Sequence, residues 1–301
     1  MFHFLTRFPL SPASFRPRLG LDVGPRHLRL AILRRRRSQL QLYGLAEHRF
    51  GQVICRHGRI TDLDLLCNAA RAMLTQCRFS DGVLGMALGL HAAAAVPLTL
   101  PAAASDLQRL AQVQAEMALR HPQSPDELVA HYCPLDEAMT AGEDVRVIAL
   151  FASMVDIEDR CALASSLQLR PGVIALRETR IATFLRQAHQ APRAGILHVD
   201  LDEAWLDLPG RWVHHFEWSA QNDRPATLLH ALAPLLQPPP ELLLLSGDAP
   251  MLATLAQVIG KYSDRPTQIA TLSPRFCDMR HHGDPTPAFH AALALAAGAL
   301  A

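Results

Sequence analysis

The chain has 301 residues, of which 50% are hydrophobic and 19% charged, a composition that indicates a globular protein with room for about two domains. Its 29 basic residues nearly balance its 28 acidic residues, so no overall field attracts nucleic acid and we expect no direct nucleic-acid binding. The six cysteines form no C-x-x-C pair and stand near no histidine at zinc spacing. This pattern favours a reduced, cytoplasmic setting and predicts no metal site.

Two segments bear on contact with membranes. Residues 1–18 are aromatic and basic but lack the continuous apolar core of a signal peptide, so we expect a disordered leader. The alternative is an arm that touches an anionic membrane surface or a partner. Residues 83–104 contain no Asp, Glu, Lys or Arg and are long enough to span a bilayer. Because prolines, glycines and a histidine interrupt that stretch, we predict a strand, a turn and a second strand.

The chain after the leader predicts a strand and then a hairpin. The segment LGLDVGPRHLRLAIL, residues 19–33, begins with an apolar strand that is broken by Asp22 and Gly24. From His27 onward, polar and apolar residues alternate, which is typical of a strand with one buried face. The arginines at 34–37 are expected at the solvated tip of the hairpin. A glycine and a carboxylate at the end of a buried strand also fit a phosphate-binding turn.

The middle of the chain predicts helices alternating with strands. TDLDLLCNAARAMLTQC is a helix that Thr61 or Asp62 can cap, and SDLQRLAQVQAEMALRH is a helix capped by Ser105. VRVIALFASM is a buried strand. The helix DIEDRCALASSLQL is expected to end at Pro171–Gly172, before the strand GVIAL. Much of this material belongs to neither half of the chain, so we expect an inserted subdomain.

The second half repeats the order of the first. ILHVDLDEAWLDLPGRWVHHFEW predicts an apolar strand ending near Asp200, a turn, an alternating strand, a second turn at Pro209–Gly210 and a further strand. PPPELLLLSGDAPMLATLAQVIG adds a strand, a turn at Ser246–Gly247 and a helix, and PAFHAALALAAGALA predicts a packed terminal helix. The duplication predicts two lobes, each a mixed sheet covered by helices, with a cleft between them.

Taken in order, these segments resemble the PilM family of type IV pilus and DNA-uptake assembly proteins, with HofM-type proteins as shorter relatives. The resemblance runs from about Arg18 to Ala301. It implies an α/β, actin-like fold of the FtsA and PilM type, with two lobes of mixed sheets flanked by helices and an inserted subdomain. The expected division is a leader at 1–18, a first lobe at 19–85 and 169–190, an inserted subdomain at 86–168 and a second lobe at 191–301.

The resemblance also implies a function. Such proteins act at the cytoplasmic face of the bacterial inner membrane, bind the amino-terminal tail of the membrane protein PilN, and relay contact to motor ATPases and other platform proteins. We expect a PilN-like partner, bound in a groove between the first lobe and the inserted subdomain, in the region from about Leu84 to Val155. The choice among pili, DNA uptake and secretion stays open, as does the oligomeric state.

A nucleotide site of this fold needs two phosphate turns and an adenosine turn, and the resemblance places them at four candidate cofactor-binding residues. These are Asp22, Gly24, Asp200 and Gly247. Each turn has lost part of its pattern: Pro25 removes a backbone donor, Asp202 stands where the second turn has glycine, and Asp248 replaces a glycine of the third.

We therefore predict a degraded nucleotide site with no catalytic residue and no assigned cofactor. Retained binding of ATP and Mg²⁺, in an active ATPase, is the alternative. A further hypothesis is that Arg26 pairs with Asp200 or Asp202 across the cleft and replaces nucleotide and metal.

A small-molecule kinase of the same superfamily is a less favoured reading. It needs an intact phosphate turn and a general-base aspartate, for which Asp62, Asp106 and Asp156 are candidates that helix capping explains equally well. The pairs His214–His215 and His281–His282 suggest a metal, but neighbouring residues in a strand point to opposite faces, so we expect surface or loop histidines.

Overall fold

The computed structural model describes most of the chain. The described residues are 17–36, 39–89, 92–120, 127–134, 144–211, 213–219, 224–273, 277–278 and 287–298. Most of the predicted leader and the pair His281–His282 lie outside them. Within the described ranges, no helix is long and apolar enough to cross a membrane, and the apolar stretch 83–104 forms two strands as predicted.

The first lobe is built on a mixed sheet in the order β10-β6-β1-β2-β3-β16. Its strands are β1 (Arg18–Val23), β2 (His27–Arg36), β3 (Gln39–Arg49), β6 (Val83–Leu88), β10 (Arg170–Leu176) and β16 (Cys277–Asp278). β1 pairs antiparallel with β2 and parallel with β6, so the predicted hairpin follows a central strand. Arg34 to Arg36 lie within β2, so the hairpin tip is shorter than the sequence predicted.

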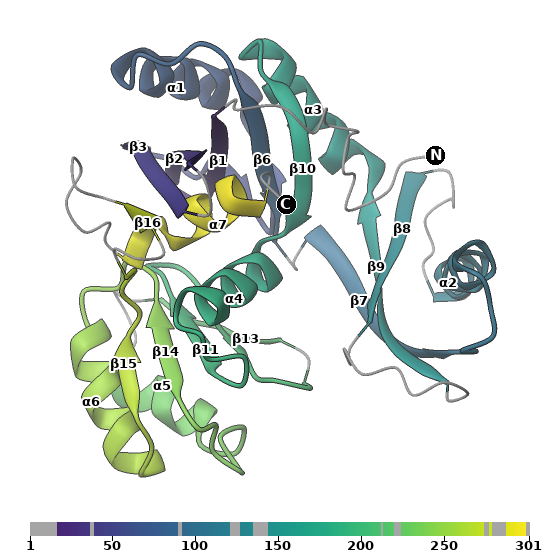
Figure 1. The fold of residues 1–301 in the computed structure, drawn as a ribbon, viewed down its shortest axis with the longest axis vertical. Helices are drawn as coiled ribbons and strands as arrows, with labels where there is room; N and C mark the ends of the chain where they lie inside the picture. The colour runs from purple at the N-terminus through teal and green to yellow at the C-terminus, as the bar shows by residue number, and fades with distance from the viewer. Residues whose placement is uncertain are drawn as a thin grey trace.

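Helices cover both faces of this first sheet. α1 (Leu63–Gln76) and α3 (Met154–Ser166) pack on one face, and α7 (His290–Gly298) packs on the other (Figure 1). Asp62 caps α1 as predicted, because its side chain accepts a hydrogen bond from the Leu65 N–H at 2.9 Å. The short hairpin of β4 (Cys55–Arg56) and β5 (Arg59–Ile60) precedes α1.

Two local predictions in this lobe were wrong. α3 ends at Ser166, and Pro171–Gly172 instead lie in β10, where the pairing with β6 shifts register. β2 was expected to bury one face, yet Arg29 and Ala31 are as buried as its leucines. The reason is that α7 and the short 3₁₀ turn before it, Pro287–Phe289, cover the second face.

The inserted subdomain is a three-stranded antiparallel sheet with one helix. It comprises β7 (Ala93–Leu100), α2 (Asp106–Arg120), β8 (Leu128–Pro134) and β9 (Val145–Ser153), with the strand order β7-β9-β8. Ser105 caps α2 as predicted, because it exchanges hydrogen bonds with Gln108 in a capping box. The subdomain projects from the side of the molecule (Figure 1) and has its own small core. α3 packs on the first lobe, so the insert is shorter than the expected 86–168.

The second lobe repeats the strand arrangement of the first. Its sheet has the order β13-β12-β11-β14-β15, formed by β11 (Gly195–Val199), β12 (Ala204–Asp207), β13 (His214–Phe216), β14 (Leu243–Ser246) and β15 (Thr267–Ile269). β11 pairs antiparallel with β12 and parallel with β14, as β1 does with β2 and β6. α5 (Pro225–Leu232) and α6 (Leu252–Ser263) complete this lobe.

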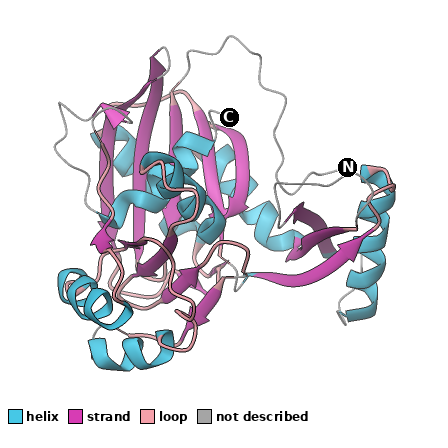
Figure 2. Ribbon diagram, turned by 60° about the horizontal axis from the view of Figure 1, so that its bottom comes forward, coloured by secondary structure: helices cyan, strands magenta, loops and turns pink. Residues whose placement is uncertain are grey.

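Two helices lie between the sheets and pack on each other. α4 (Arg177–Ala188) contacts β11 and β12, whereas α7 contacts β1, β2 and β6 (Figures 1 and 2). α7 therefore completes the first lobe, although the sequence division assigned residues 191–301 to the second. The physical reason is close packing: a Cβ on Gly20 or Gly85 would overlap the α7 backbone, so these strands admit the alanine-rich helix.

Candidate functional site

The predicted site residues meet where the two lobes face each other. Asp22 lies near the end of β1 and Asp200 directly after β11, and both carboxylates are buried. Arg177, the first residue of α4, donates from Nε to Asp22 Oδ1 at 2.8 Å and from Nη2 to Asp200 Oδ2 at 2.9 Å. Its Nη1 also pairs with Glu203. One guanidinium thus bridges the two carboxylates that the sequence assigned to the phosphate turns.

The charges of neighbouring side chains decide the protonation states of Asp22, Asp200 and Arg177. Burial by itself would raise the pKa of Asp22, but Arg177 and His27 lower that pKa far below its usual range. Burial likewise opposes the ionised form of Asp200, whose pKa is nevertheless lowered by His198, Arg177 and Arg29. The Arg177 pKa is raised, because Asp22 and Asp200 outweigh its burial. Both aspartates and the arginine are therefore charged.

A second arginine crosses the same junction. Arg29 of β2 is fully buried (0% exposed) and donates from Nε to Glu47 at 3.0 Å and from Nη1 to the Ala288 carbonyl at 3.1 Å. Its Nη2 binds Asp248, and Nη1 lies 3.6 Å from Asp200. Arg29 thus joins the first sheet to the loop that follows β14 in the second.

A buried chain of polar contacts extends from Asp200 into the interior. His198 Nε2 lies 3.0 Å from Asp200, His198 Nδ1 lies 3.2 Å from Ser246 Oγ, and Ser246 Oγ lies 2.9 Å from His290 Nδ1 on α7. Burial, followed by the influence of His198, lowers the pKa of His290 to about 3, so this ring is neutral. The Asp–His–Ser order resembles a hydrolase triad, but Ser246 is fully buried and already paired with a second histidine. The chain is structural and ties α7 to the second lobe.

The first phosphate turn is closed by its own residues. The Gly24 N–H donates to the His27 carbonyl at 3.0 Å, and Pro25 has no N–H. The His27 imidazole occupies the space beside Gly24 that a Cβ would otherwise fill. Because an anion site needs free backbone N–H groups and open space, this turn cannot cradle a phosphate in the conformation observed.

The other two turns are closed in the same way. The Asp200 N–H donates to the Glu203 carbonyl at 2.9 Å, and the Asp248 N–H donates to Asp200 Oδ1 at 3.0 Å. Gly247 adopts a φ of 110°, and a side chain there would overlap the Val199 carbonyl, which explains why this position is glycine. The structure therefore brings the candidate residues together but uses their backbone donors internally.

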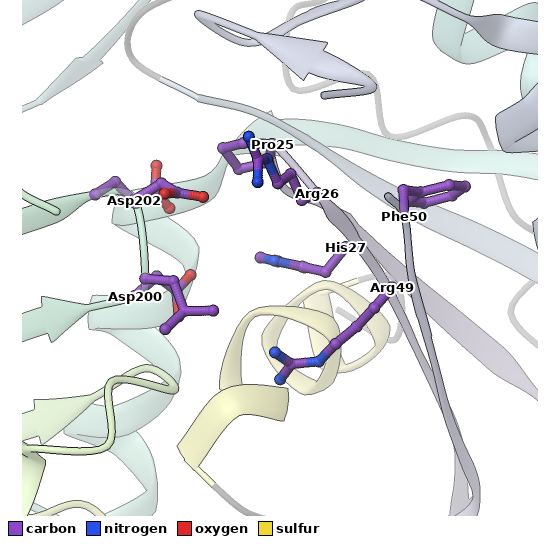
Figure 3. A pocket seen from close by; sticks show the side chains of 9 residues that line it. Pro25, Arg26, His27, Arg49, Phe50, Asp200 and Asp202 are labelled. Atoms are coloured by element: carbon purple, nitrogen blue, oxygen red, sulfur yellow. The ribbon is translucent and has the colours of Figure 1, made fainter. Parts of the chain in front are cut away.

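A small cavity remains at the mouth of this junction (Figure 3). It measures about 160 Å³, below the roughly 300–1,000 Å³ typical of small-molecule sites. Asp200 and Asp202 lie on one side, and Arg26, His27 and Arg49 on the other. Arg26 is exposed and lines the cavity. The cross-cleft pair expected of Arg26 is formed instead by Arg29 and Arg177, which sequence reasoning missed.

The residues present do not fit a magnesium nucleotide. His198, Asp200 and Glu203 place one donor atom each within 4.8 Å of one another, the geometry of a metal cluster in the described ranges. Arg177 already contacts both carboxylates of that trio, so a cation there would face a fixed guanidinium. We derive no catalytic step from this site.

The kinase and metal candidates from the sequence have other roles. Asp62 caps α1, Asp106 accepts a hydrogen bond from the Tyr132 hydroxyl, and the Asp156 carboxylate pairs with Arg59 at 3.4 Å. His214 and His215 are neighbours on β13, and His215 lies 3.5 Å from Glu178. None of these residues lines the cavity between the lobes.

Two lobes with the same strand order, two helices between them and an inserted subdomain define an actin-like ATPase fold. A chain of the PilM-PilN type IV pilus biogenesis complex matches with a TM-score of 0.75 and 18% identity, over 96% of this chain and 100% of its own length. This likeness confirms the fold that the sequence resemblance implied.

Two other solved structures are similar at greater distance. A Bacteroides thetaiotaomicron protein with an actin-like ATPase fold and unknown function has a TM-score of 0.50 at 14% identity, over 85% of this chain and 91% of its own. The ethanolamine utilization protein EutJ from Carboxydothermus hydrogenoformans has a TM-score of 0.53 at 7% identity, over 97% and 92%. No family model and no curated protein sequence matches the chain.

Proposed function

We propose that this protein is a scaffold in a type IV pilus, DNA-uptake or related secretion machine, where it holds the amino-terminal tail of a PilN-like membrane protein at the cytoplasmic face of the inner membrane. The observation that supports the proposal most is the likeness, over nearly the whole chain, to a chain of a PilM-PilN complex. Motor ATPases and other platform proteins are the further partners that such a scaffold would contact.

The junction between the lobes supports a scaffold that works without nucleotide. Arg177 provides the positive charge that a metal ion would bring to Asp22 and Asp200, and Arg29 joins the lobes directly. A phosphate at the first turn would have to displace the His27 ring from beside Gly24 and the buried Asp22 carboxylate, and break the hydrogen bond from the Gly24 N–H to the His27 carbonyl. Hydrolysis of ATP is therefore not part of this proposal.

The inserted subdomain offers the geometry for a bound tail. In its sheet, β9 pairs with a strand on each side, whereas β7 and β8 each pair with one strand only, within the described residues. β7 is the edge strand nearer the first lobe (Figure 1), where a peptide can add backbone hydrogen bonds while side chains enter the groove. This edge lies in the expected region from Leu84 to Val155.

A buried arginine fixes the subdomain at its root. Arg160 of α3 donates from Nε to the Ala87 carbonyl at 2.6 Å, from Nη1 to the Asp156 carbonyl at 2.6 Å and from Nη2 to the Gly58 carbonyl at 2.8 Å. The end of β6, the β4–β5 hairpin and α3 therefore meet on one side chain. A fixed root keeps the proposed groove in one shape, which lowers the entropy cost of binding.

The test is a calorimetric titration of the full chain with a synthetic peptide covering the amino-terminal tail of a PilN-like protein encoded nearby, with and without Mg-ATP. We expect saturable binding whose Kd is unchanged by Mg-ATP, no binding of a scrambled peptide, and no rise in Tm with Mg-ATP alone. Absence of peptide binding contradicts the partner. Binding that requires Mg-ATP contradicts the nucleotide-free scaffold and restores the ATPase.

A further inference from the structure

Helix α2 carries apolar side chains on its solvent face. Within the helix, Val113 and Met117 are buried against the small sheet, whereas Leu107 is 64% exposed and Leu119 is 81% exposed. Figure 1 shows α2 at the outer rim of the molecule, away from both lobes. Two exposed leucines on one short helix leave apolar area in water, which favours a contact with another surface.

The same solvent face lacks charge. At 3.6 residues per turn, all four charged residues of α2 fall on the other side of the helix. They pair among themselves, Arg120 with Glu116 at 2.8 Å and Arg109 with Asp106 at 3.8 Å. The solvent face carries Leu107, Gln108, Ala111, Gln112, Gln114, Ala115, Ala118 and Leu119. A charged partner surface would find no opposite charge on this face. An uncharged partner surface can bind here without burying an unpaired charge.

Six of the eight residues on this face are arranged symmetrically about Val113. Leu107 and Leu119, Ala111 and Ala115, and Gln112 and Gln114 stand at equal distances on either side. Two such helices can lie antiparallel about a two-fold axis at the height of Val113. Residues at equal distances before and after Val113 then stand at the same height along the helix pair, so Ala111 meets Ala115 of the partner subunit. Small residues at the centre permit close approach of the helices, and a two-fold interface requires this self-complementarity.

The same face has a shallow, open groove next to these residues. Pro101, Ala103, Ala104, Gln108, Ala111 and Gln112 line an open groove beside the first turns of α2. Leu119 lies on the same side of the helix as Gln108 and Gln112. In the antiparallel pair Leu119 comes level with the partner's Leu107, one residue from the partner's Gln108 on the same side, and enters the partner's groove, while Leu107 packs on the partner's Ala118.

We propose that α2 is a self-association surface through which two copies of this chain pair antiparallel. The proposal does not rest on the peptide-binding function. The helix has 15 residues, which gives about 22 Å of contact, so the buried area lies below that of a standard stable interface. The dimer is therefore weak in dilute solution and favoured where many copies gather on one assembly.

Sedimentation velocity of the full chain, from micromolar to several hundred micromolar, tests the proposal. We expect a reversible monomer–dimer equilibrium in which Leu119→Asp raises the dimer dissociation constant about tenfold or more. Val155→Asp is the matched control, because Val155 is also an exposed apolar helix residue and lies outside the proposed surface. It should leave the equilibrium unchanged, and circular dichroism should show both variants folded. A chain that stays monomeric throughout, or a dimer insensitive to Leu119→Asp, overturns the proposal.

The antiparallel arrangement has its own test. Ala111→Glu alone and Ala115→Lys alone should each weaken the dimer, because each places like charges near the two-fold axis. An equimolar mixture of the two variants should restore it, because the new glutamate comes level with the new lysine. Failure of the mixture to restore association contradicts this geometry. If α2 amides gain hydrogen-exchange protection only when the PilN-like peptide is added, that peptide is the occupant and the second copy is excluded.

Discussion

Two buried carboxylates, Asp22 and Asp200, depend on a single side chain, the guanidinium of Arg177, for much of their charge balance. The three groups come from three separate elements, so their interaction joins β1, β11 and the start of α4. In a buried network of this kind, loss of one member costs more than the network contributes overall, because the remaining charges stay desolvated.

Arg177→Met should therefore lower the free energy of unfolding by about 3–5 kcal/mol, measured by urea denaturation at pH 7. Arg193→Met is the matched control, since Arg193 is 81% exposed and lies 4.0 Å from an exposed glutamate, Glu241. The control should change stability by less than about 0.5 kcal/mol. Equal effects of the two substitutions would show that the bridge does not join the lobes.

The buried His290 side chain predicts that the stability of the fold depends on pH. Its pKa is about 3 in the folded chain against 6.5 in the unfolded chain, so between these values the unfolded state binds a proton that the folded state does not. Stability therefore rises with pH across this window, by up to about 1.4 kcal/mol per pH unit, and is lost as pH falls from 6.5. His290→Asn should flatten the slope measured between pH 6.5 and 5, where most carboxylates do not yet titrate. His230→Asn, at an exposed position on α5, should keep the wild-type slope.

The sequence carries a local signal for Asp22, Gly24, Asp200 and Gly247, because each lies at or just after the end of an apolar strand. Their assignment to a nucleotide site stays a prediction. Arg29 and Arg177 could not be predicted as their partners, for two reasons. An arginine in an alternating strand is expected to face solvent unless the helix that covers it is known. For Arg29 that covering element includes α7, at the far end of the chain. Arg177 is 155 residues from Asp22, a separation that no local pattern reports.

At the scale of elements, the small residues of α7 match the glycines of the strands on which this helix packs. Seven consecutive residues of this helix, His290–Ala296, are buried, and most are alanines. They lie on strands that present Gly20 and Gly85, so the backbones of helix and sheet come close together. Composition predicted the helix itself, because an alanine-rich apolar run after a proline is a local signal. Its partner sheet could not be predicted, because both lobes contain similar strands.

Gly20→Ala should lower the free energy of unfolding by about 1–3 kcal/mol, and Gly20→Val by more. The added Cβ meets the Ala292 carbonyl and the Ala296 nitrogen, which are backbone atoms that cannot rotate away. Gly51→Ala is the matched control, because nothing lies within 4 Å of a Cβ at that position. Thermal denaturation measures both variants. A neutral Gly20→Ala would mean that α7 packs less closely on β1 than the structure shows.

At the scale of the whole molecule, one large apolar cluster joins the two lobes, and the second lobe and the inserted subdomain each have a smaller cluster as well. The main apolar cluster runs from Leu19 in the first sheet through α7 and α4 to Trp205 in the second sheet. The subdomain cluster is smaller and centres on Val113, Val147 and Phe151. The main cluster also reaches one face of the subdomain sheet, at Val129 and Ile148, whereas the other face is covered only by the smaller cluster. Because cooperative units follow continuous cores, the lobes should unfold together while the outer part of the subdomain opens locally at lower free energy.

Arg160 tests this division, because its side chain ties together the two points where the chain passes between the first lobe and the subdomain, at Ala87 and Asp156. Arg160→Met leaves three backbone carbonyls, those of Gly58, Ala87 and Asp156, without this donor. Native-state hydrogen exchange should then show protection lost in residues 93–153 by about tenfold or more, with a smaller change in β1, β11 and α7. Arg71→Met, at an exposed arginine of α1, should leave both regions unchanged. A uniform loss of protection across all three parts would mean that the subdomain and the lobes form one cooperative unit. In that case the proposed groove between them would open only by global unfolding, and it would not adjust locally to a bound tail.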